Sequence, residues 1–457
     1  MNLNGPEVLL FLLALAILRA TGRPGLFAMW PITFIVFPTA RLYYGFPLYL
    51  YDIVSVLLLL EYRRDLLALR WGWNCLPWHY VFFALIAVSG VAWPLVVFSP
   101  NPQIAWIAFH TSLAMAAFGL SAMMFADPRK VRERAMLGYG LAASIIVMGL
   151  IGALQFGSPA NAGQIASFFF RDFGDETFVN TDFYAEIAAE RAAGPYGSAN
   201  ILGVVAVLGA MAASIVVRNR ALLLVTFAAA AIALLSSVSR QAVIGLLLMG
   251  PVYFLMTRSR ERFWAVLLSL TMLPLLAAAF MASDYVTPLF ERFGRWEGGI
   301  ENDANFVARY VAGPERLAEA ISEFPSILLF GTGPDIGKLV AAGVDTHGRE
   351  FGFASVSYLL FLFQYGILGL VAGVSMHIQA MNQLKLVPDA IRARVAAMIA
   401  AVVVFYLTDN MPNISETVTI LCLLPIGLCA GCAIQSLRPS AFSAGGAPRR
   451  DFKLSGT

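Results

Sequence analysis

Apolar runs of about twenty residues recur along the whole chain and are separated by short connections that carry charge. A helix needs about 20 apolar residues to cross the hydrocarbon core of a bilayer. Of the 457 residues, 59% are hydrophobic and 13% are charged, whereas a soluble domain has about 25% charged residues. The pattern therefore predicts an all-α polytopic membrane protein. The net charge of +3 is spread over short loops, so nothing indicates a nucleic-acid partner.

The positions of the apolar runs predict about 13 transmembrane helices, within roughly 12–14. The predicted spans are 6–20, 25–40, 46–62, 78–99, 103–125, 136–156, 199–217, 221–237, 241–257, 263–282, 354–379, 394–410 and 414–436. They divide the chain into N-terminal helices (1–156), a first long loop (157–198), central helices (199–282), a large loop (283–353), C-terminal helices (354–436) and a flexible tail (437–457). Short helices are expected inside the two long loops.

Lys and Arg residues predict the side on which each connection lies. They cluster in every second connection and in the tail, at 63–70, 129–134, 218–220, 258–262, 385–394 and 438–453. Because positively charged loops remain in the cytoplasm, both long loops are expected on the periplasmic side. By the same rule, Arg19 and Arg23 against Arg41 place the N-terminus outside.

Arginine residues on the outer side are the first candidates for a functional site. Arg240 follows a serine-rich junction, 236–239, that joins two spans with almost no loop. An arginine at a membrane boundary either reaches a lipid phosphate or faces an internal cavity. Its planar guanidinium suits a phosphate because it can donate to two oxygens. Arg309 begins a predicted helix in the large loop that ends at Phe324 and Pro325.

His347 is the one histidine with ionisable neighbours in the sequence, since Asp345, Arg349 and Glu350 lie beside it. It could act as a general base near neutral pH, and a solvated loop histidine is the alternative. The other histidines, His79, His110 and His377, lie inside or at the ends of spans, where packing with one satisfied hydrogen bond is expected. No metal-ligand spacing is present, so no metal and no cofactor are predicted.

Four short motifs follow one another between Arg191 and Gly369. They are Gly194 to Asn200 ahead of a span, Ser239 with Arg240 at an outer helix end, the helix led by Arg309 followed by Gly331 to Gly333, and Ser355 to Leu359 with Gln364 to Gly369. Their order resembles the O-antigen ligase and polymerase family, which are glycosyltransferases of the bacterial inner membrane. These enzymes use glycans linked to a polyprenyl diphosphate.

One departure from the family distinguishes its two activities. Ligases usually begin the last motif with His-Asn, and this chain has Ser355 and Val356 there. The resemblance therefore implies a Wzy-type polysaccharide polymerase for O-antigen or exopolysaccharide, with a ligase as the alternative. A transporter or flippase of lipid-linked glycan is a competing class, and a non-catalytic assembly factor is a smaller possibility.

The resemblance also implies roles for particular residues. Arg240 and Arg309 would bind the donor diphosphate and stabilise its charge as the glycan leaves. His347 or Glu350 would act as the base for the attacking hydroxyl. Further substrate contacts are expected from Arg191, Tyr196, Asn200 and Tyr358. The expected partners are the polyprenyl-diphosphate-linked oligosaccharide donor and acceptor and the lipid bilayer, with a chain-length regulator and a flippase as protein partners.

Overall fold

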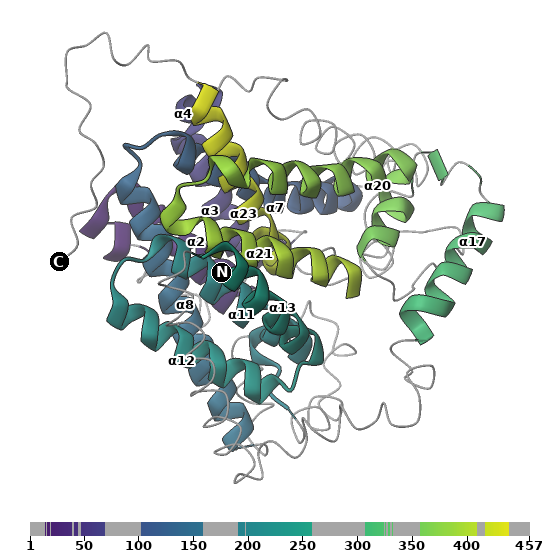
Figure 1. Cartoon of the computed structure of the whole chain (residues 1–457), viewed down its shortest axis with the longest axis horizontal. Coiled ribbons are helices and arrows are strands. Elements are labelled where there is room, and N and C mark those ends of the chain that lie inside the picture. Colours follow the sequence, from purple (N-terminus) through teal and green to yellow (C-terminus); the bar gives the residue numbers. More distant parts are fainter. Residues whose placement is uncertain are drawn as a thin grey trace.

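Helices dominate the computed structural model of the chain (Figure 1). It describes residues 14, 16–18, 20–38, 41–43, 47–68, 102–158, 191–196, 198–257, 307–323, 325, 328–329, 331, 357–408 and 416–437. Within these residues, six helices are long and apolar enough to cross a membrane. The fold is that of an all-α membrane protein. The predicted spans at 78–99 and 263–282 lie outside the described residues, so the total of thirteen stays a prediction.

The described elements follow the predicted apolar runs closely. In chain order they are η1 (Arg23–Gly25), α2 (Leu26–Pro31), η2 (Ile32–Val36), β1 (Arg41–Tyr43), β2 (Pro47–Tyr49), α3 (Leu50–Glu61), α4 (Arg63–Leu67), α7 (Pro102–Ala126), α8 (Val131–Gly157), η4 (Gly194–Tyr196), α11 (Ala199–Val216), α12 (Arg220–Ser237), α13 (Arg240–Met256), η6 (Ala308–Ala312), α17 (Gly313–Glu323), α20 (Ser357–Gln383), η7 (Leu384–Leu386), α21 (Asp389–Thr408) and α23 (Glu416–Leu437).

A short antiparallel hairpin corrects the expectation of a purely helical chain. Its strands β1 and β2 pair Arg41 with Tyr49 and Tyr43 with Pro47. The span predicted at 46–62 therefore begins as a helix only at Leu50. Pro47 and the aromatic residues around it suit an extended backbone better than a first helical turn.

The helix α20 is bent inside the span predicted at 354–379. Gly366 has φ 70° and ψ −172°, values that lie outside any helix. A second glycine, Gly331, also has a positive φ, and a side chain on it would overlap the backbone of Gln364. Glycine adopts this conformation without steric penalty, so the bend and the close contact both depend on residues without Cβ atoms.

The centre of the described bundle is α23. Its apolar window is completely buried, and it packs against α7, α11, α20 and α21. Side chains at Gly427 and Gly431 would overlap the backbone of α7, so the two helices approach at the separation that small residues permit. Leucines on α12 and α13 remain exposed, such as Leu224 (71%) and Leu247 (61%), which suits helices that face lipid.

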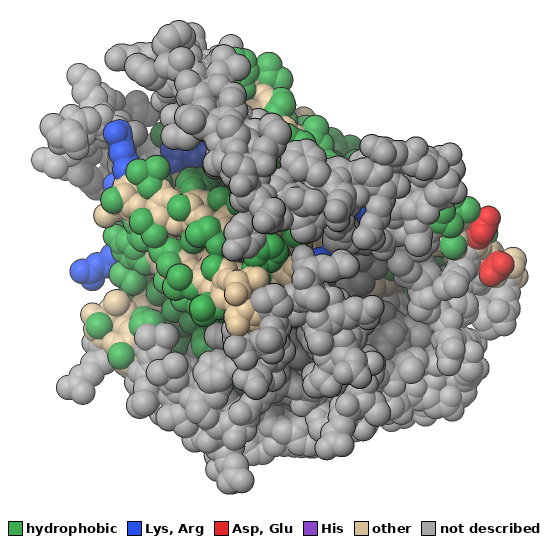
Figure 2. All heavy atoms as spheres, turned by 90° about the horizontal axis from the view of Figure 1, so that it is seen from below, with side chains coloured by type: hydrophobic (Ala, Val, Ile, Leu, Met, Phe, Trp, Pro, Cys, Tyr) green, Lys and Arg blue, Asp and Glu red, His purple; other side chains and the backbone are tan. Residues whose placement is uncertain are grey.

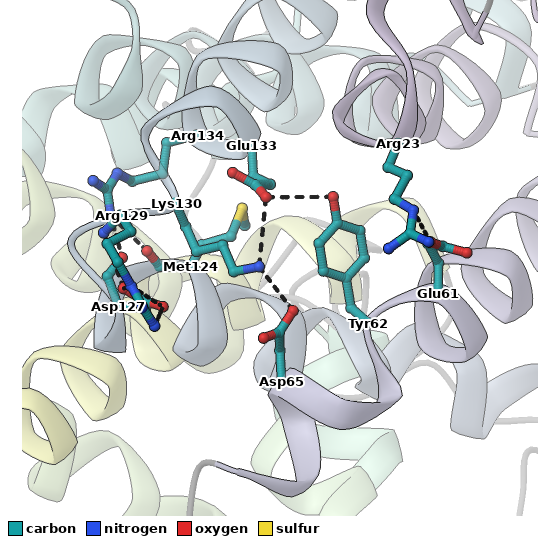
Figure 3. Close-up of polar contacts among 10 residues, drawn as sticks. All are labelled: Arg23, Glu61, Tyr62, Asp65, Met124, Asp127, Arg129, Lys130, Glu133 and Arg134. Carbon is teal, nitrogen blue, oxygen red and sulfur yellow. Dashed lines mark hydrogen bonds and ion pairs between the residues drawn. The ribbon is translucent and has the colours of Figure 1, made fainter.

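Charged side chains gather at one end of the helices, which we call the basic end (Figure 3). The Nζ atom of Lys130 lies 2.7 Å from Oδ2 of Asp65 and 3.5 Å from Oε1 of Glu133. On the same end, Arg23 pairs with Glu61. Arg394 at the start of α21 donates to a carbonyl at the end of α11. Figure 2 shows Lys and Arg side chains toward the left edge of the molecule and Asp and Glu side chains at the right edge.

The helix ends away from these residues form a second group, which we call the distal end. There, Thr417 at the start of α23 donates to the carbonyl of Phe34 at 2.5 Å, and Tyr310 donates to the carbonyl of Leu407 at 2.8 Å. The connection from Ser236 to Arg240 lies at the same end, because α12 leaves the basic end at Arg220. The alternation of the two ends agrees with the alternation of basic connections in the sequence.

Candidate functional site

A buried amide fixes the turn that precedes α11. Gln155, near the end of α8, donates to the carbonyl of Gly194 at 3.2 Å and accepts from the amide of the same residue at 2.8 Å. The amide of Ala192 donates to the carbonyl of Ser236 at 2.7 Å. Arg191 therefore lies beside the end of α12, in a turn that α8 and α12 hold in place.

Tyr196 has a structural contact at the other side of this turn. Its hydroxyl donates to the carbonyl of Ile35 at 2.7 Å, and burial raises the pKa of Tyr196 well above its ordinary value. The ring thus ties the turn to η2. Asn200, the second residue of α11, is half-buried. Direct contact of Tyr196 or Asn200 with a substrate stays a prediction.

The junction between α12 and α13 packs against the start of α11. A side chain on Gly203 would lie 2.7 Å from Cβ of Ser239 and 2.8 Å from Oγ of Ser237. Both serines are completely buried. Val238 has φ 49°, a left-handed conformation that is rare for a β-branched residue. Such strain persists only where the surroundings enforce it and occurs often at functional sites.

Arg240 is the first residue of α13, directly after the cap residue Ser239. The side chain of Ser239 accepts from the amide of Ala242 at 3.4 Å. A helix N-terminus carries partial positive charge and favours an anion. The half-buried Arg240 adds a full positive charge at the same helix end. Arg240 and the adjoining amides could together bind a phosphate.

Tyr310 brings the predicted helix of the large loop to the same end. The π-helical turn η6 contains Arg309, of which the structure describes only the backbone. The hydrogen bond from Tyr310 to Leu407 attaches this turn to the end of α21. A side chain on Gly245 would touch the ring of Phe405 at 2.7 Å from Cε1, so α21 ends beside the first turns of α13.

Tyr358 belongs to a group of aromatic rings near the end of α21. Its ring centroid lies 5.5 Å from that of Tyr406, 5.9 Å from that of His377 and 6.0 Å from that of Phe361. His377 packs inside the bundle and has one hydrogen bond, as the sequence predicted, with 2.8 Å between Nδ1 and the carbonyl oxygen of Gly373.

Four of the predicted site segments therefore lie at the distal end. They are the turns that contain Arg191 and Arg240, the backbone of Arg309 and the aromatic group with Tyr358.

No family model matches the chain, and no curated protein matches it.

The remaining predicted site residues are not placed. His347 and Glu350 lie outside the described residues. In the part of the chain that the structure describes, no group of three His, Cys, Asp or Glu side chains could hold a metal ion.

Two residues of the site were missed from the sequence. Gln155 positions the turn before α11, and Tyr310 attaches η6 to α21. The sequence did contain a signal for Gln155: its side-chain amide lies near the end of an apolar run, and a buried amide needs hydrogen-bond partners. Tyr310 follows Arg309 directly, but its partner is 97 residues away, and no local pattern indicates such a contact.

Proposed function

We propose that the chain is a glycosyltransferase that polymerises oligosaccharide units linked to a polyprenyl diphosphate. One observation carries the proposal: the turns of Arg191 and Arg240, together with the backbone of Arg309, lie at the distal end. The distribution of basic connections predicts that this end is periplasmic, and the resemblance to O-antigen polymerases implies a reaction on that face. The half-buried arginine at the start of α13 provides positive charge for a diphosphate.

The chemistry is a displacement at the anomeric carbon of the donor. A hydroxyl of the acceptor glycan attacks that carbon, and the bond to the diphosphate oxygen breaks. Negative charge then develops on the leaving diphosphate. Arg240 and the helix amides beside it would stabilise this charge, and fixed donors achieve this without reorganising during the reaction. Ser237 and Ser239 keep the junction rigid, since both are packed against α11.

The N-terminal turns of the two arginine-led helices offer a matched experiment. Arg220 is also the first residue of a helix, but it is exposed at the basic end. We expect Arg240→Ala to abolish polymer formation in proteoliposomes supplied with purified lipid-linked repeat units, and Arg240→Lys to retain part of it, because lysine keeps the charge and loses the two-pronged geometry. Arg220→Ala should leave polymer formation unchanged.

The gel pattern of the products separates the possible outcomes. A ladder that is unchanged in Arg240→Ala, at equal protein abundance, would contradict the assignment of Arg240 to the diphosphate. Wild-type proteoliposomes that make no polymer but pass single units to a lipid acceptor would favour the ligase.

A flippase is the second candidate, and the bend at Gly366 favours it, because interrupted helices are common in secondary transporters. Transporters place the interruption beside a site near the middle of the membrane. Transfer of labelled lipid-linked glycan across the bilayer, without any change in glycan length, would support this function. Formation of longer glycans without a second protein would contradict it.

A further inference from the structure

The bend in α20 brings two distant side chains of this helix together. Tyr358 and His377 are 19 residues apart, which corresponds to about 28 Å in a straight helix. Their ring centroids are 5.9 Å apart. The two halves of α20 therefore fold toward each other about Gly366, and Tyr358 covers His377.

His377 is enclosed by aromatic side chains close to the candidate site. The ring of Tyr406 lies 4.9 Å from the imidazole in an edge-on arrangement, and Phe361 lies 5.4 Å from Tyr406. His377, Tyr406 and Phe361 are each 2% exposed, whereas Tyr358 is only half-buried. Tyr406 precedes Leu407, the residue to which Tyr310 is bonded. The enclosure thus adjoins the distal end, and Tyr358 is its outermost wall.

The hydrogen bond of His377 determines which ring nitrogen can accept a proton. The carbonyl oxygen of Gly373 can only accept, so Nδ1, at 2.8 Å from it, carries the hydrogen. In neutral imidazole the other nitrogen is then a bare acceptor. Nε2 is buried and has no hydrogen-bond partner within the described part of the chain. Buried polar atoms almost always have a partner, and a hydroxyl group would supply the missing donor.

We infer that His377 is the proton acceptor of the proposed glycosyl transfer, an inference that rests on the proposed function. The acceptor hydroxyl enters beside Tyr358 and donates to Nε2. As its oxygen bonds to the anomeric carbon, the proton moves to Nε2, and the electron pair of the breaking bond leaves with the diphosphate oxygen. The carbonyl of Gly373 holds Nδ1–H and stabilises the imidazolium, which returns its proton to the departing diphosphate.

Two substitutions at one position separate this role from packing. His377→Asn keeps an N–H that can donate to the carbonyl of Gly373 but has no basic nitrogen, and Met376→Leu changes a neighbouring buried side chain without changing its chemistry. A general base contributes about 10²-fold to 10⁴-fold to a rate. We expect kcat for glycosyl transfer in proteoliposomes to fall by about this factor in His377→Asn, with the donor KM and thermal stability unchanged. Met376→Leu should transfer at the wild-type rate.

A second measurement uses the wild-type protein and does not depend on how the variant folds. The nitrogen-15 resonance of the unprotonated Nε2 is assigned by its loss in His377→Asn or, should that variant not fold, by its coupling within α20. Addition of lipid-linked repeat units should shift this resonance, because Nε2 gains a hydrogen bond. An unshifted resonance, or His377→Asn with wild-type kcat, would overturn the inference and leave the proposed function standing. Absence of transfer by the wild-type protein would instead refute the proposed function.

Discussion

Replacing Gln155 with Met should loosen the turn that carries Arg191. Gln155 is 2% exposed and makes two hydrogen bonds to the backbone of Gly194, at 3.2 and 2.8 Å. Methionine has nearly the same length but no polar group, so the volume is kept while the amide and the carbonyl of Gly194 both lose a partner. A buried polar group left without a partner costs about 1–3 kcal/mol. The free energy of unfolding should therefore fall by about 2–6 kcal/mol in total.

The assay is denaturant unfolding of the purified protein in mixed micelles, followed by helical circular dichroism. Leu154→Met is the matched control, because Leu154 is the preceding residue of α8 and is 59% exposed. Its free energy of unfolding should change by less than about 0.5 kcal/mol. Gln155→Met should also lower glycosyl transfer, since the turn orients Arg191. Equal unfolding midpoints for the two variants would refute the reasoning that Gln155 supports the turn.

Three further results are expected. Gly431→Ala should destabilise the protein by about 1–3 kcal/mol in the same unfolding assay, because its new methyl group would meet a backbone carbonyl of α7 that cannot move aside. Tyr310→Phe should lower the rate of glycosyl transfer while costing about 1 kcal/mol or less in stability, because it removes the exposed hydrogen bond to the carbonyl of Leu407. An unchanged rate would show that this hydrogen bond is dispensable. A hydrogen bond from Arg129 lowers the pKa of Asp127 below its ordinary value of 3.8. The ionised carboxylate therefore stabilises the fold above pH 3.8 and loses this effect as the pH falls through the lower, folded pKa, so the stability difference between wild type and Asp127→Asn should shrink in acid and stay constant near neutral pH.

The helices could be predicted from the sequence because each apolar run must satisfy its own backbone groups inside a membrane. The span expected at 199–217 is α11, Ala199–Val216, and the span expected at 221–237 is α12, Arg220–Ser237. The bend at Gly366 could not be predicted in this way, since a glycine within an apolar helical pattern is common in membrane spans. Its conformation accompanies contact with Gly331, a residue far away in the sequence.

The candidate site was predictable as a set of residues on one side, but its internal contacts were not. The basic connections indicated that Arg191 and Arg240 share a face, and the bond from Ala192 to Ser236 brings their turns together. Which carbonyl accepts from Tyr310 depends on how α21 is placed against η6. Packing across the whole bundle sets that placement. No short sequence pattern indicates it.

The central position of α23 has a consequence for the biogenesis of the protein. This helix is the last of the described helices to be synthesised, yet it fills the middle of the bundle and contacts α7, α11, α20 and α21. Before α23 is inserted, the helix surfaces that it later covers have no protein partner from α23. These surfaces then face lipid or an insertion factor. The described bundle can therefore close only once α23 has been inserted. A chain truncated before Glu416 lacks the central helix α23. Membrane proteases of the cell should therefore degrade it as an unassembled protein.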